Sequence, residues 1–528
     1  MGDTKWTPDQ RKVIELRDRN ILVSAAAGSG KTAVLVQRII EKISDKSNPV
    51  DIDKLLVVTF TRAAAAEMKE RILSAIENMI IDNPDDEHLQ RQVTLLHNAQ
   101  ITTIDSFCQN IIRNYFYTID LDPVFRVGDE NELSIVKTDL LQDIIEEKYS
   151  QEDEKYDRFV EFADTLSPGR TDGDIEELVL KLFNISMSYP WPMEWLKSCG
   201  EMYKCSSVEE LEKSLWLKEL SSYVHEMASV YLDMAKKAKR MCNDDNGPGQ
   251  YSDAIESDII QINEMVEASS YTEQFEAFYR YNPARLSTKK DPLADPDKKK
   301  EVKYIRDLYK KRISGIKEDF FFQSPDEMLK DMKKMQPMID QLIELTIEFS
   351  KTFAEKKRAD GILDFADMEH FALDILVTKN EDKVEPSSVA KELQEYYDEI
   401  MTDEYQDSNF VQELILTSIS RTPENKPYLF MVGDVKQSIY QFRLARPELF
   451  MKKYNTYSTG DSKYQRIDLH QNFRSRECVL ESANYIFGKI MQKCVGGIDY
   501  DEAASLVPGR VYKECEYRTS DSTDIIVI

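Results

Sequence analysis

The stretch that decides the fold runs from Ile21 to Thr32 and has the sequence ILVSAAAGSGKT. Its first five residues are mostly apolar and predict a buried strand, and the small residues after them predict a tight loop. Beyond the loop, apolar residues recur every three to four positions over 32–43, which predicts a helix. A strand, a loop of small residues and a helix together form the arrangement that binds nucleotide phosphates.

The loop matches the pattern GxxxxGK[ST], with alanine in place of the first glycine. Small residues let backbone N–H groups approach a phosphate, and the helix N-terminus adds positive potential. In this pattern Lys31 reaches the β- and γ-phosphates, and the Thr32 hydroxyl binds Mg²⁺. The alternative is a turn of small residues that binds nothing. We predict an ATP site formed by Ala25, Ala26, Ala27, Gly28, Ser29, Gly30, Lys31 and Thr32.

A second candidate site is the acidic segment DEYQD at 403–407, which follows the apolar residues Ile400 and Met401. Hydrolysis of a nucleotide needs one carboxylate for Mg²⁺ and one that accepts a proton from the attacking water. We assign Asp403 to the metal and Glu404 to the general base. In isolation a solvated acidic loop is the simpler explanation, but the phosphate loop favours the catalytic one.

The order of the elements predicts the fold class. Apolar runs at 55–60 and 428–432 resemble the first strand in length and in their flanking turn residues. Such an alternation predicts an α/β fold of the P-loop NTPase type, with a parallel sheet and its chemistry at the strand carboxyl ends. The segment 116–360 has helical periodicity instead and predicts a large helical insertion. The α/β pattern therefore lies on both sides of this insertion.

The composition excludes several classes of protein. The 528 residues carry a formal net charge of −27, which excludes a uniformly basic coat for nucleic acid. A local basic surface is not excluded, because residues 426–484 hold ten basic and six acidic side chains. Seven cysteines without a CxxC pair favour a reducing, cytoplasmic setting over a disulfide framework or zinc ribbon. The polar N-terminus and the lack of a long apolar run predict neither a signal peptide nor a membrane span.

Further blocks occur in a defined order along the chain. They are WTPDQ (6–10), VVTFTRAAAAEMKERI (57–72), TTIDSF (102–107), LDFADM (363–368), DEYQDSN (403–409), VGDVKQSIYQFRLARPELF (432–450) and LHQNFRS (469–475). Together they resemble the motif set of the superfamily 1 DNA helicases of the UvrD/Rep type. The TIDSF form, the long insertion and the segments at 122–130 and 496–509 are most similar to the AddA-type ATP-dependent helicase–nucleases.

The resemblance implies a first RecA-like motor domain at 1–115 and 361–468 and the start of a second at 469–528. It also implies an ATP-dependent 3′→5′ DNA helicase or translocase that acts in double-strand break repair and recombination. It also implies roles around the nucleotide. Gln10 is expected to contact the adenine edge, Arg38 to pack near the adenine, and Phe473 to lie against the base. Gln437 is expected to sense the γ-phosphate. Arg474 is expected to act as an arginine finger, which contributes about 10³–10⁵ in rate.

The resemblance also implies how DNA is held. A motor must grip a strand irrespective of its sequence, so stacking on aromatic rings and contacts to the backbone are expected. The aromatic residues at matching positions are Phe60, Tyr440 and Phe442, and the polar ones are Thr61, Arg62, Ser106 and Arg443. The alternative is that the rings belong to the core and the polar groups to the ordinary surface.

Two features stay without a role at this stage. Asp105 stands where UvrD-type relatives commonly have histidine, and we take it as a marker of the AddA branch. For Asp364 and Asp367 in LDFADM, helix packing is the default interpretation.

The position of Ile528 leads us to expect a truncated second motor domain, no nuclease domain, and an apolar strand at 525–528. The expected partners are single- or double-stranded DNA and a second helicase–nuclease subunit of the AddB type, in a heterodimer. Two alternatives are kept: a fragment that binds ATP, DNA or a partner without unwinding, and a stand-alone UvrD-like helicase. The length of the insertion disfavours the second alternative.

Overall fold

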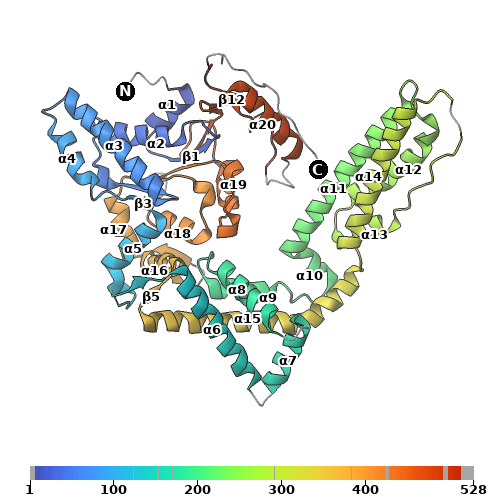
Figure 1. Cartoon of the computed structure of the whole chain (residues 1–528), viewed down its shortest axis with the longest axis horizontal. Helices are drawn as coiled ribbons and strands as arrows, with labels where there is room; N and C mark the ends of the chain where they lie inside the picture. The colour runs from blue at the N-terminus through green and yellow to red at the C-terminus, as the bar shows by residue number, and fades with distance from the viewer. Residues whose placement is uncertain are drawn as a thin grey trace. The chain divides into compact units, whose positions relative to one another are not determined.

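The fold is described from a computed structural model of the chain (Figure 1). The structure describes residues 6–122, 124–150, 154–167, 171–289, 292–381, 383–421, 427–491, 498–502 and 504–512. The strand predicted at 525–528 lies outside these residues. Contacts divide the chain into two compact units. Unit 1 comprises Met1–Asp157, Leu166–Trp195 and Thr346–Ile528, and unit 2 comprises Arg158–Thr165 and Leu196–Leu345.

Unit 1 is built on a six-stranded sheet in which all neighbouring strands are parallel. The spatial order is β10-β1-β9-β8-β2-β3. The strands are β1 (Asn20–Ala25), β2 (Leu55–Thr59), β3 (Ile101–Thr103), β8 (Glu399–Thr402), β9 (Tyr428–Gly433) and β10 (Tyr464–Leu469). The predicted parallel α/β sheet is therefore confirmed. Two of its strands, β3 and β10, were not among the predicted ones.

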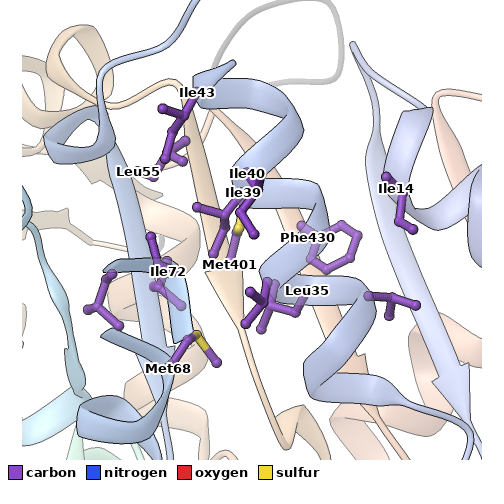
Figure 2. Packing of buried hydrophobic residues seen from close by; sticks show 14 of the residues in the cluster. Ile14, Leu35, Ile39, Ile40, Ile43, Leu55, Met68, Ile72, Met401 and Phe430 are labelled. Carbon is purple, nitrogen blue, oxygen red and sulfur yellow. The ribbon is translucent and has the colours of Figure 1, made fainter. Parts of the chain in front are cut away.

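Alternate residues of each strand supply two separate cores. Along β1, Ile21 and Val23 face one core, whereas Leu22 faces the other. This alternation follows from the period of two in a strand, and both faces are apolar because helices cover both. The first face is covered by α1 (Pro8–Glu15), α2 (Lys31–Ile43), α3 (Arg62–Asp82) and α4 (Glu87–Leu96). Figure 2 shows side chains of this core, among them Leu35 of α2 and Phe430 of β9.

The second face is covered by helices from distant parts of the sequence. They are α5 (Ile104–Tyr115), α16 (Phe365–Leu376), α17 (Ser388–Tyr396), α18 (Phe410–Ser418) and α19 (Pro447–Thr456). The small strand pairs of unit 1 are β4 (Arg126–Val127) with β5 (Ile362–Leu363), β6 (Val377–Asn380) with β7 (Lys383–Pro386), and β11 (Gln471–Asn472) with β12 (Val507–Pro508). A further helix, α20 (Glu477–Ile490), contacts β12.

Unit 2 is helical and has its own apolar core. Its long helix α11 (Leu215–Asn243) lies beside α12 (Ser252–Glu267) and α14 (Pro296–Phe320), as Figure 1 shows. The shorter helices are α10 (Val208–Lys213) and α13 (Tyr271–Arg280). The helices α6 (Glu130–Tyr149) and α8 (Gly173–Ser186) belong to unit 1, whereas α7 (Glu154–Leu166), α9 (Pro192–Glu201) and α15 (Pro325–Asp360) contribute residues to both units.

The predicted insertion at 116–360 is helical along most of its described length. Its flanks are grouped with the sheet in unit 1, so unit 2 is smaller than the predicted segment. The insertion boundaries stay a prediction.

Candidate nucleotide and DNA site

The phosphate loop joins β1 to α2 at the carboxyl edge of the sheet. Gly28 and Gly30 both have positive φ angles, 70° and 87°, which favour glycine over other residues. A Cβ on Gly28 would lie 2.7 Å from Asn472 Nδ2 and 2.9 Å from the Cβ of Arg474. The sequence GSG therefore lets the loop turn and lets the segment at 471–475 lie directly against it.

Hydrogen bonds to carbonyl groups of the phosphate loop join these two segments. The Asn472 amide donates to the carbonyl oxygen of Ala27 at 2.7 Å, and the Phe473 N–H donates to that of Gly28 at 2.9 Å. The Arg474 N–H donates to the Asn472 side-chain oxygen at 2.9 Å, so Asn472 also fixes the backbone of Arg474. Arg474 itself is exposed beside the loop, where an arginine finger is needed.

Lys31 and Glu404 meet directly. The Lys31 ammonium lies 2.9 Å from Glu404 Oε2, and the same oxygen accepts a hydrogen bond of 2.8 Å from the Gln406 amide. Glu404 has a left-handed backbone conformation, with φ at 52°. Such a conformation is uncommon for a residue other than glycine, and is found most often where a site requires it. The two catalytic assignments made from separate parts of the sequence therefore converge in space.

The carboxylates on either side of Glu404 are shifted toward the protonated form. Burial raises the pKa of Asp403 to about 6, with a further contribution from the charge of Glu404. Burial and then the charge of Glu404 also raise the pKa of Asp407 to about 6. Three carboxylates in one short segment beside one lysine repel each other, so a divalent cation would stabilise their charged forms.

The acidic segment is linked to the end of β9 by Gln406. Its side-chain oxygen accepts a hydrogen bond of 2.9 Å from the Asp434 N–H. A Cβ on Gly433 would lie only 2.5 Å from that oxygen, so glycine is needed there. Asp434 in turn accepts a hydrogen bond of 2.7 Å from the Gln437 amide and pairs with Lys436 at 3.0 Å. Gln437 is thus connected to the acidic segment through Asp434 and Gln406.

Gln10 and Phe473 line one pocket of about 250 Å³ next to the phosphate loop. Its lining also includes Ser29 and the segment from Asp468 to Gln471. Gln10 is held in place because its amide donates to the Ser29 carbonyl at 3.0 Å and its side-chain oxygen accepts from the Thr7 N–H. A pocket with an amide on one wall and an aromatic ring on another suits a purine base.

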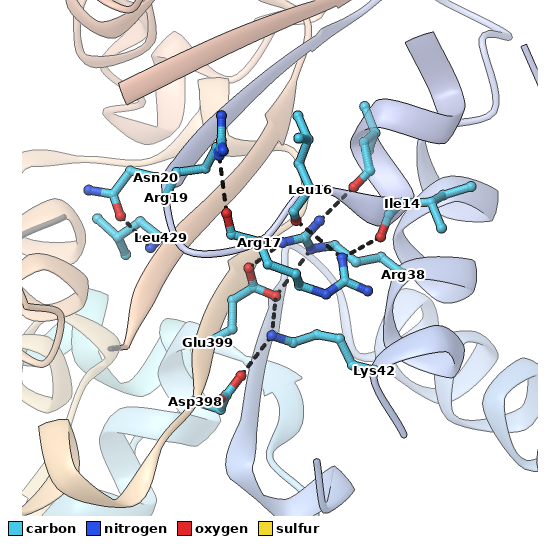
Figure 3. A network of polar contacts seen from close by, with 11 residues as sticks. Ile14, Leu16, Arg17, Arg19, Asn20, Arg38, Lys42, Asp398, Glu399 and Leu429 are labelled. Atoms are coloured by element: carbon cyan, nitrogen blue, oxygen red, sulfur yellow. Dashed lines mark hydrogen bonds and ion pairs between the residues drawn. The ribbon is translucent and has the colours of Figure 1, made fainter. Parts of the chain in front are cut away.

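Arg38 does not belong to this pocket, and the prediction that it packs near the adenine is wrong. It is fully buried, and its guanidinium binds both carboxylate oxygens of Glu399 at 2.6 and 3.1 Å and the carbonyl of Val13 at 2.7 Å. Glu399 begins β8, so this pair lies at the amino edge of the sheet, opposite the phosphate loop. Figure 3 shows the network, which Lys42 extends to Asp398. Because its donors are bound inside the protein, Arg38 has a structural role.

The residues predicted to bind DNA gather at the ends of neighbouring strands. Phe60, Thr61 and Arg62 follow β2, and Ser106 follows β3. The Phe60 ring lies 4.6 Å from the Tyr440 ring, centroid to centroid. The Tyr440 ring is 5.8 Å from that of Phe442, which is 75% exposed. An exposed ring of this size is unusual for a core residue and suits base stacking.

The polar members of this group differ in their surroundings. The Arg443 guanidinium lies 5.6 Å from the Tyr440 ring centroid and 5.8 Å from that of Phe442. Arg62 is exposed at the start of α3, where the Thr61 hydroxyl accepts from the Ala64 N–H and caps the helix. Ser106 shares a hydrogen bond of 3.0 Å with Thr103 near the start of α5. Thr61 and Ser106 therefore have helix-capping partners as well as a place on this edge.

Asp364 and Asp367 form a capping box at the start of α16. Each side chain accepts the other residue's backbone N–H, at 2.8 and 2.9 Å. The buried Lys357 ammonium lies 2.7 Å from Asp364 and 2.6 Å from Asp367. The helix-packing interpretation thus gains a specific form, in which LDFADM starts a helix and pairs a buried lysine.

The site fits a nucleotide with its metal. In the part of the chain that the structure describes, the Ser29 hydroxyl and Asp407 Oδ1 are buried without a hydrogen-bond partner. Buried polar groups of this kind normally bind something. No group of three or more potential metal-ligating side chains occurs among the described residues.

Three residues with clear geometric roles were not assigned from the sequence. They are Gln406, Asp434 and Asn472, each of which positions another site residue. All three lie within quoted motif blocks, but a motif alone does not tell a positioning side chain from a reacting one. Among the described residues, no helix is long and apolar enough to cross a membrane.

Comparison with known proteins identifies the family. The model of the UvrD/REP helicase N-terminal domain matches residues 6–458. The A-type subunit of the ATP-dependent helicase/nuclease of Lachnoclostridium phytofermentans is 50% identical over 519 residues, which are 97% of this chain and 38% of that protein. The protein of the same name from Clostridium beijerinckii is 43% identical over 522 residues, 98% of this chain and 42% of that protein. This chain spans about two fifths of the length of these curated relatives. It belongs to the UvrD/REP helicase N-terminal domain family.

Proposed function

We propose that this chain is the ATP-binding motor region of a 3′→5′ DNA helicase–translocase that acts in double-strand break repair and recombination. The observation that carries the proposal is the direct contact of Lys31 with Glu404, with Asn472 and Arg474 packed on the same loop. The phosphate loop, the acidic segment at 403–407 and the segment at 471–475 that carries Arg474 therefore lie together at one edge of the sheet. This is the set of groups that phosphoryl transfer requires.

On ATP binding, the loop N–H groups and Lys31 would hold the phosphates, while Gln10 and Phe473 would hold the base. Lys31 would then exchange its contact with Glu404 for the β- and γ-phosphates. Glu404 would be released to accept a proton from the attacking water, and Arg474 would stabilise charge that develops on the γ-phosphate. Bound through Thr32 and Asp403, Mg²⁺ would neutralise phosphate charge. Gln437, which contacts Asp434, would report the state of the γ-phosphate to the neighbouring strand ends.

DNA would bind along the edge formed by the ends of β2, β3 and β9. Phe60, Tyr440 and Phe442 would stack on bases, each for about 1–3 kcal/mol. Thr61, Arg62, Ser106 and Arg443 would contact the backbone. Because phosphate contacts dominate such binding, affinity should fall as salt is added.

The partner is proposed from the relatives' printed name, which describes one subunit of an enzyme. We propose that a second helicase–nuclease subunit of the AddB type completes a cytoplasmic heterodimer, and that the nuclease activity lies outside these 528 residues. The alternative is a region that binds ATP, DNA or a partner without unwinding, because the chain spans only about two fifths of the length of these relatives.

The test is phosphate release from ATP with and without single-stranded DNA. Wild type is expected to be stimulated by DNA, and Lys31→Ala to release little phosphate in either condition. Equal rates in the two proteins would contradict the proposal. Strand displacement on a duplex with a 3′ tail separates the two candidate functions, since DNA-stimulated hydrolysis without displacement supports the alternative.

A further inference from the structure

Tyr405, the third residue of the acidic segment, is 1% exposed and belongs to the second core. Its hydroxyl donates a hydrogen bond of 2.6 Å to Glu413 Oε2 on α18. Burial, and then the charge of Glu413, hold the pKa of Tyr405 well above its ordinary value, so the hydroxyl keeps its proton and donates. No role in the nucleotide site or at the DNA edge accounts for this contact.

The other oxygen of Glu413 binds a helix from further along the chain. The Lys453 ammonium of α19 lies 2.5 Å from Glu413 Oε1, and it is also 5.4 Å from the centroid of the Tyr405 ring. The side chains of Glu413 and Lys453 are 17% and 16% exposed. A carboxylate that is largely shielded from water and binds both an ammonium and a hydroxyl holds its partners more firmly than a surface pair does. Tyr405, Glu413 and Lys453 therefore form one chain of contacts from the acidic segment to α19.

The helix α19 begins directly after the segment at 434–446, which carries the rings of the proposed DNA edge. At its first end this segment is bound to the acidic segment, because the Asp434 N–H donates to the side-chain oxygen of Gln406. At its last end the Arg446 N–H donates to the carbonyl oxygen of Ser408 at 2.9 Å. The contacts through α19 fasten this last end a second time. A displacement of the segment is therefore passed to the acidic segment at both ends.

The residue most sensitive to such a displacement is Glu404, which directly precedes Tyr405. Its backbone is left-handed, with φ at 52°. A conformation of this kind persists only where the surrounding structure fixes it. Lys31 holds the carboxylate of Glu404, and the buried Tyr405 holds the backbone that follows. The placement of Glu404 therefore depends on how Tyr405 is anchored.

We propose that Glu413 is a positioning residue that links α19 to Tyr405, so that DNA stacked on the segment at 434–446 changes the placement of Glu404. The segment is displaced when a base stacks on its rings. The displacement reaches Tyr405 through Lys453 and Glu413 and alters the backbone at the proposed general base. This inference rests on the proposed DNA-stimulated ATPase and adds to it the residues of one route by which DNA acts on hydrolysis.

The test compares ATP hydrolysis with and without saturating single-stranded DNA in wild type and Tyr405→Phe. Phenylalanine keeps the buried ring and removes only the hydroxyl that binds Glu413. The rate without DNA is expected to stay within about twofold, and the DNA-stimulated kcat to fall about tenfold, as for loss of one hydrogen bond to a charged group. The KM for ATP should not change, because no contact to the nucleotide is removed. The matched control is Tyr397→Phe, which takes one hydroxyl from another buried tyrosine of the same core and should leave both rates unchanged.

Variants of Lys453 separate the link to α19 from a local effect at Tyr405. Lys453→Met leaves the Tyr405 hydroxyl on Glu413 and removes only the contact with α19, so it should lower the stimulated rate as Tyr405→Phe does. Lys453→Arg keeps a cation for the same carboxylate and should retain stimulation to within about threefold of wild type. Because the two contacts act in series, the double variant of Tyr405→Phe and Lys453→Met should be no slower than the slower single variant.

The outcomes separate the two proposals. A wild type that DNA does not stimulate contradicts the proposed function itself. A stimulated wild type with an equally stimulated Tyr405→Phe, or with an equally stimulated Lys453→Met, contradicts only the role of Glu413. An equal fall of both rates in Tyr405→Phe, or additive losses in the double variant, shows a merely structural contact and overturns the inference. If Lys453→Met does not fold, the comparison of Tyr405→Phe with Tyr397→Phe decides by the same criterion.

Discussion

Two ion pairs join α2 to the ends of β8, and they differ in how far solvent reaches the paired side chains. Lys31, at the start of α2, meets Glu404 just beyond the strand, and the two side chains are 11% and 34% exposed. Arg38, seven residues later, meets Glu399 at the beginning of the strand, and these side chains are 0% and 2% exposed. The same helix and strand therefore have an accessible pair at the carboxyl edge and a sealed pair at the amino edge.

The difference shows how a structural ion pair is told from a functional one. The Arg38 guanidinium uses its donors on Glu399 and the Val13 carbonyl, and lies over the Phe430 ring at 4.6 Å. Lys31 pairs with an acidic segment that holds a buried oxygen of Asp407 without a hydrogen-bond partner. A pair can exchange its partner for a ligand only where solvent reaches it and neighbouring polar groups can bind that ligand.

The largest expected effect on stability belongs to the sealed pair. Arg38→Met leaves Glu399 buried with Lys42, at 3.4 Å, in place of the guanidinium that bound both of its oxygens. Loss of one partner of a buried pair costs about 3–5 kcal/mol, so the free energy of unfolding should fall by that amount. Urea denaturation measures it, with Lys31→Ala as the matched control, which should lose less than about 1 kcal/mol. Equal losses of stability in the two variants would contradict the distinction between the sealed pair and the accessible pair.

The accessible pair should show the reverse pattern in activity. Lys31→Ala removes a charge aimed at the transferred phosphate and should lower the rate of ATP hydrolysis about 10²–10³-fold. The measurement is steady-state phosphate release with DNA present at saturation. Arg38→Met, assayed at a temperature where it is folded, serves as the control and should keep most of its rate. Loss of ATP hydrolysis in a folded Arg38→Met protein would show that Arg38 does act at the nucleotide site.

The sealed pair also predicts an acid dependence of stability. Arg38 and then Lys42 hold the pKa of Glu399 at about 2, against an ordinary value of 4.5, despite its burial. A depressed pKa contributes stability that is present above about pH 4.5 and is lost as the pH falls through about 2. The full contribution is roughly 3 kcal/mol.

The measurement uses urea denaturation of wild type and Glu399→Gln between about pH 6 and pH 3. The stability difference between the two proteins should shrink steadily below about pH 4.5. A difference that does not change with pH would mean that Glu399 is not held ionised by its partners.

The smallest expected effect concerns the DNA edge next to the accessible pair. Phe442→Ala removes an exposed ring and should weaken binding of single-stranded DNA by about 1–3 kcal/mol, roughly 5- to 150-fold. Fluorescence anisotropy with a labelled oligonucleotide measures the affinity. Val479→Ala, which removes another exposed apolar side chain of unit 1, is the control. Loss of thermal stability in Phe442→Ala, with unchanged affinity, would make the ring a packing residue.

That the parts of the candidate nucleotide site meet was largely predictable, because each part is encoded locally. Lys31 follows a strand and a glycine loop, and Glu404 follows another strand, so parallel pairing alone brings both to one edge. Arg38 shows where such reasoning fails. Its spacing along α2 turns it toward the amino edge, and no local pattern indicates that Glu399 lies there. The buried Glu369 of α16 could not be assigned a partner either, because the amides that bind it, those of Asn409 and Gln412, come from another helix and its cap.

The sequence by itself determined the class of the fold and the places of the glycine-rich loop and the acidic segment at strand ends, because strand and helix periods and small-residue turns are encoded in neighbouring residues. Only the tertiary structure decided which charged groups are sealed and which are accessible. It separated Arg38 from Lys31, and it gave Asp364 and Asp367 to a helix cap with the buried Lys357. The physical reason is that burial and hydrogen-bond satisfaction depend on side chains far apart in the sequence, whose contact is fixed only once the helices pack on the sheet.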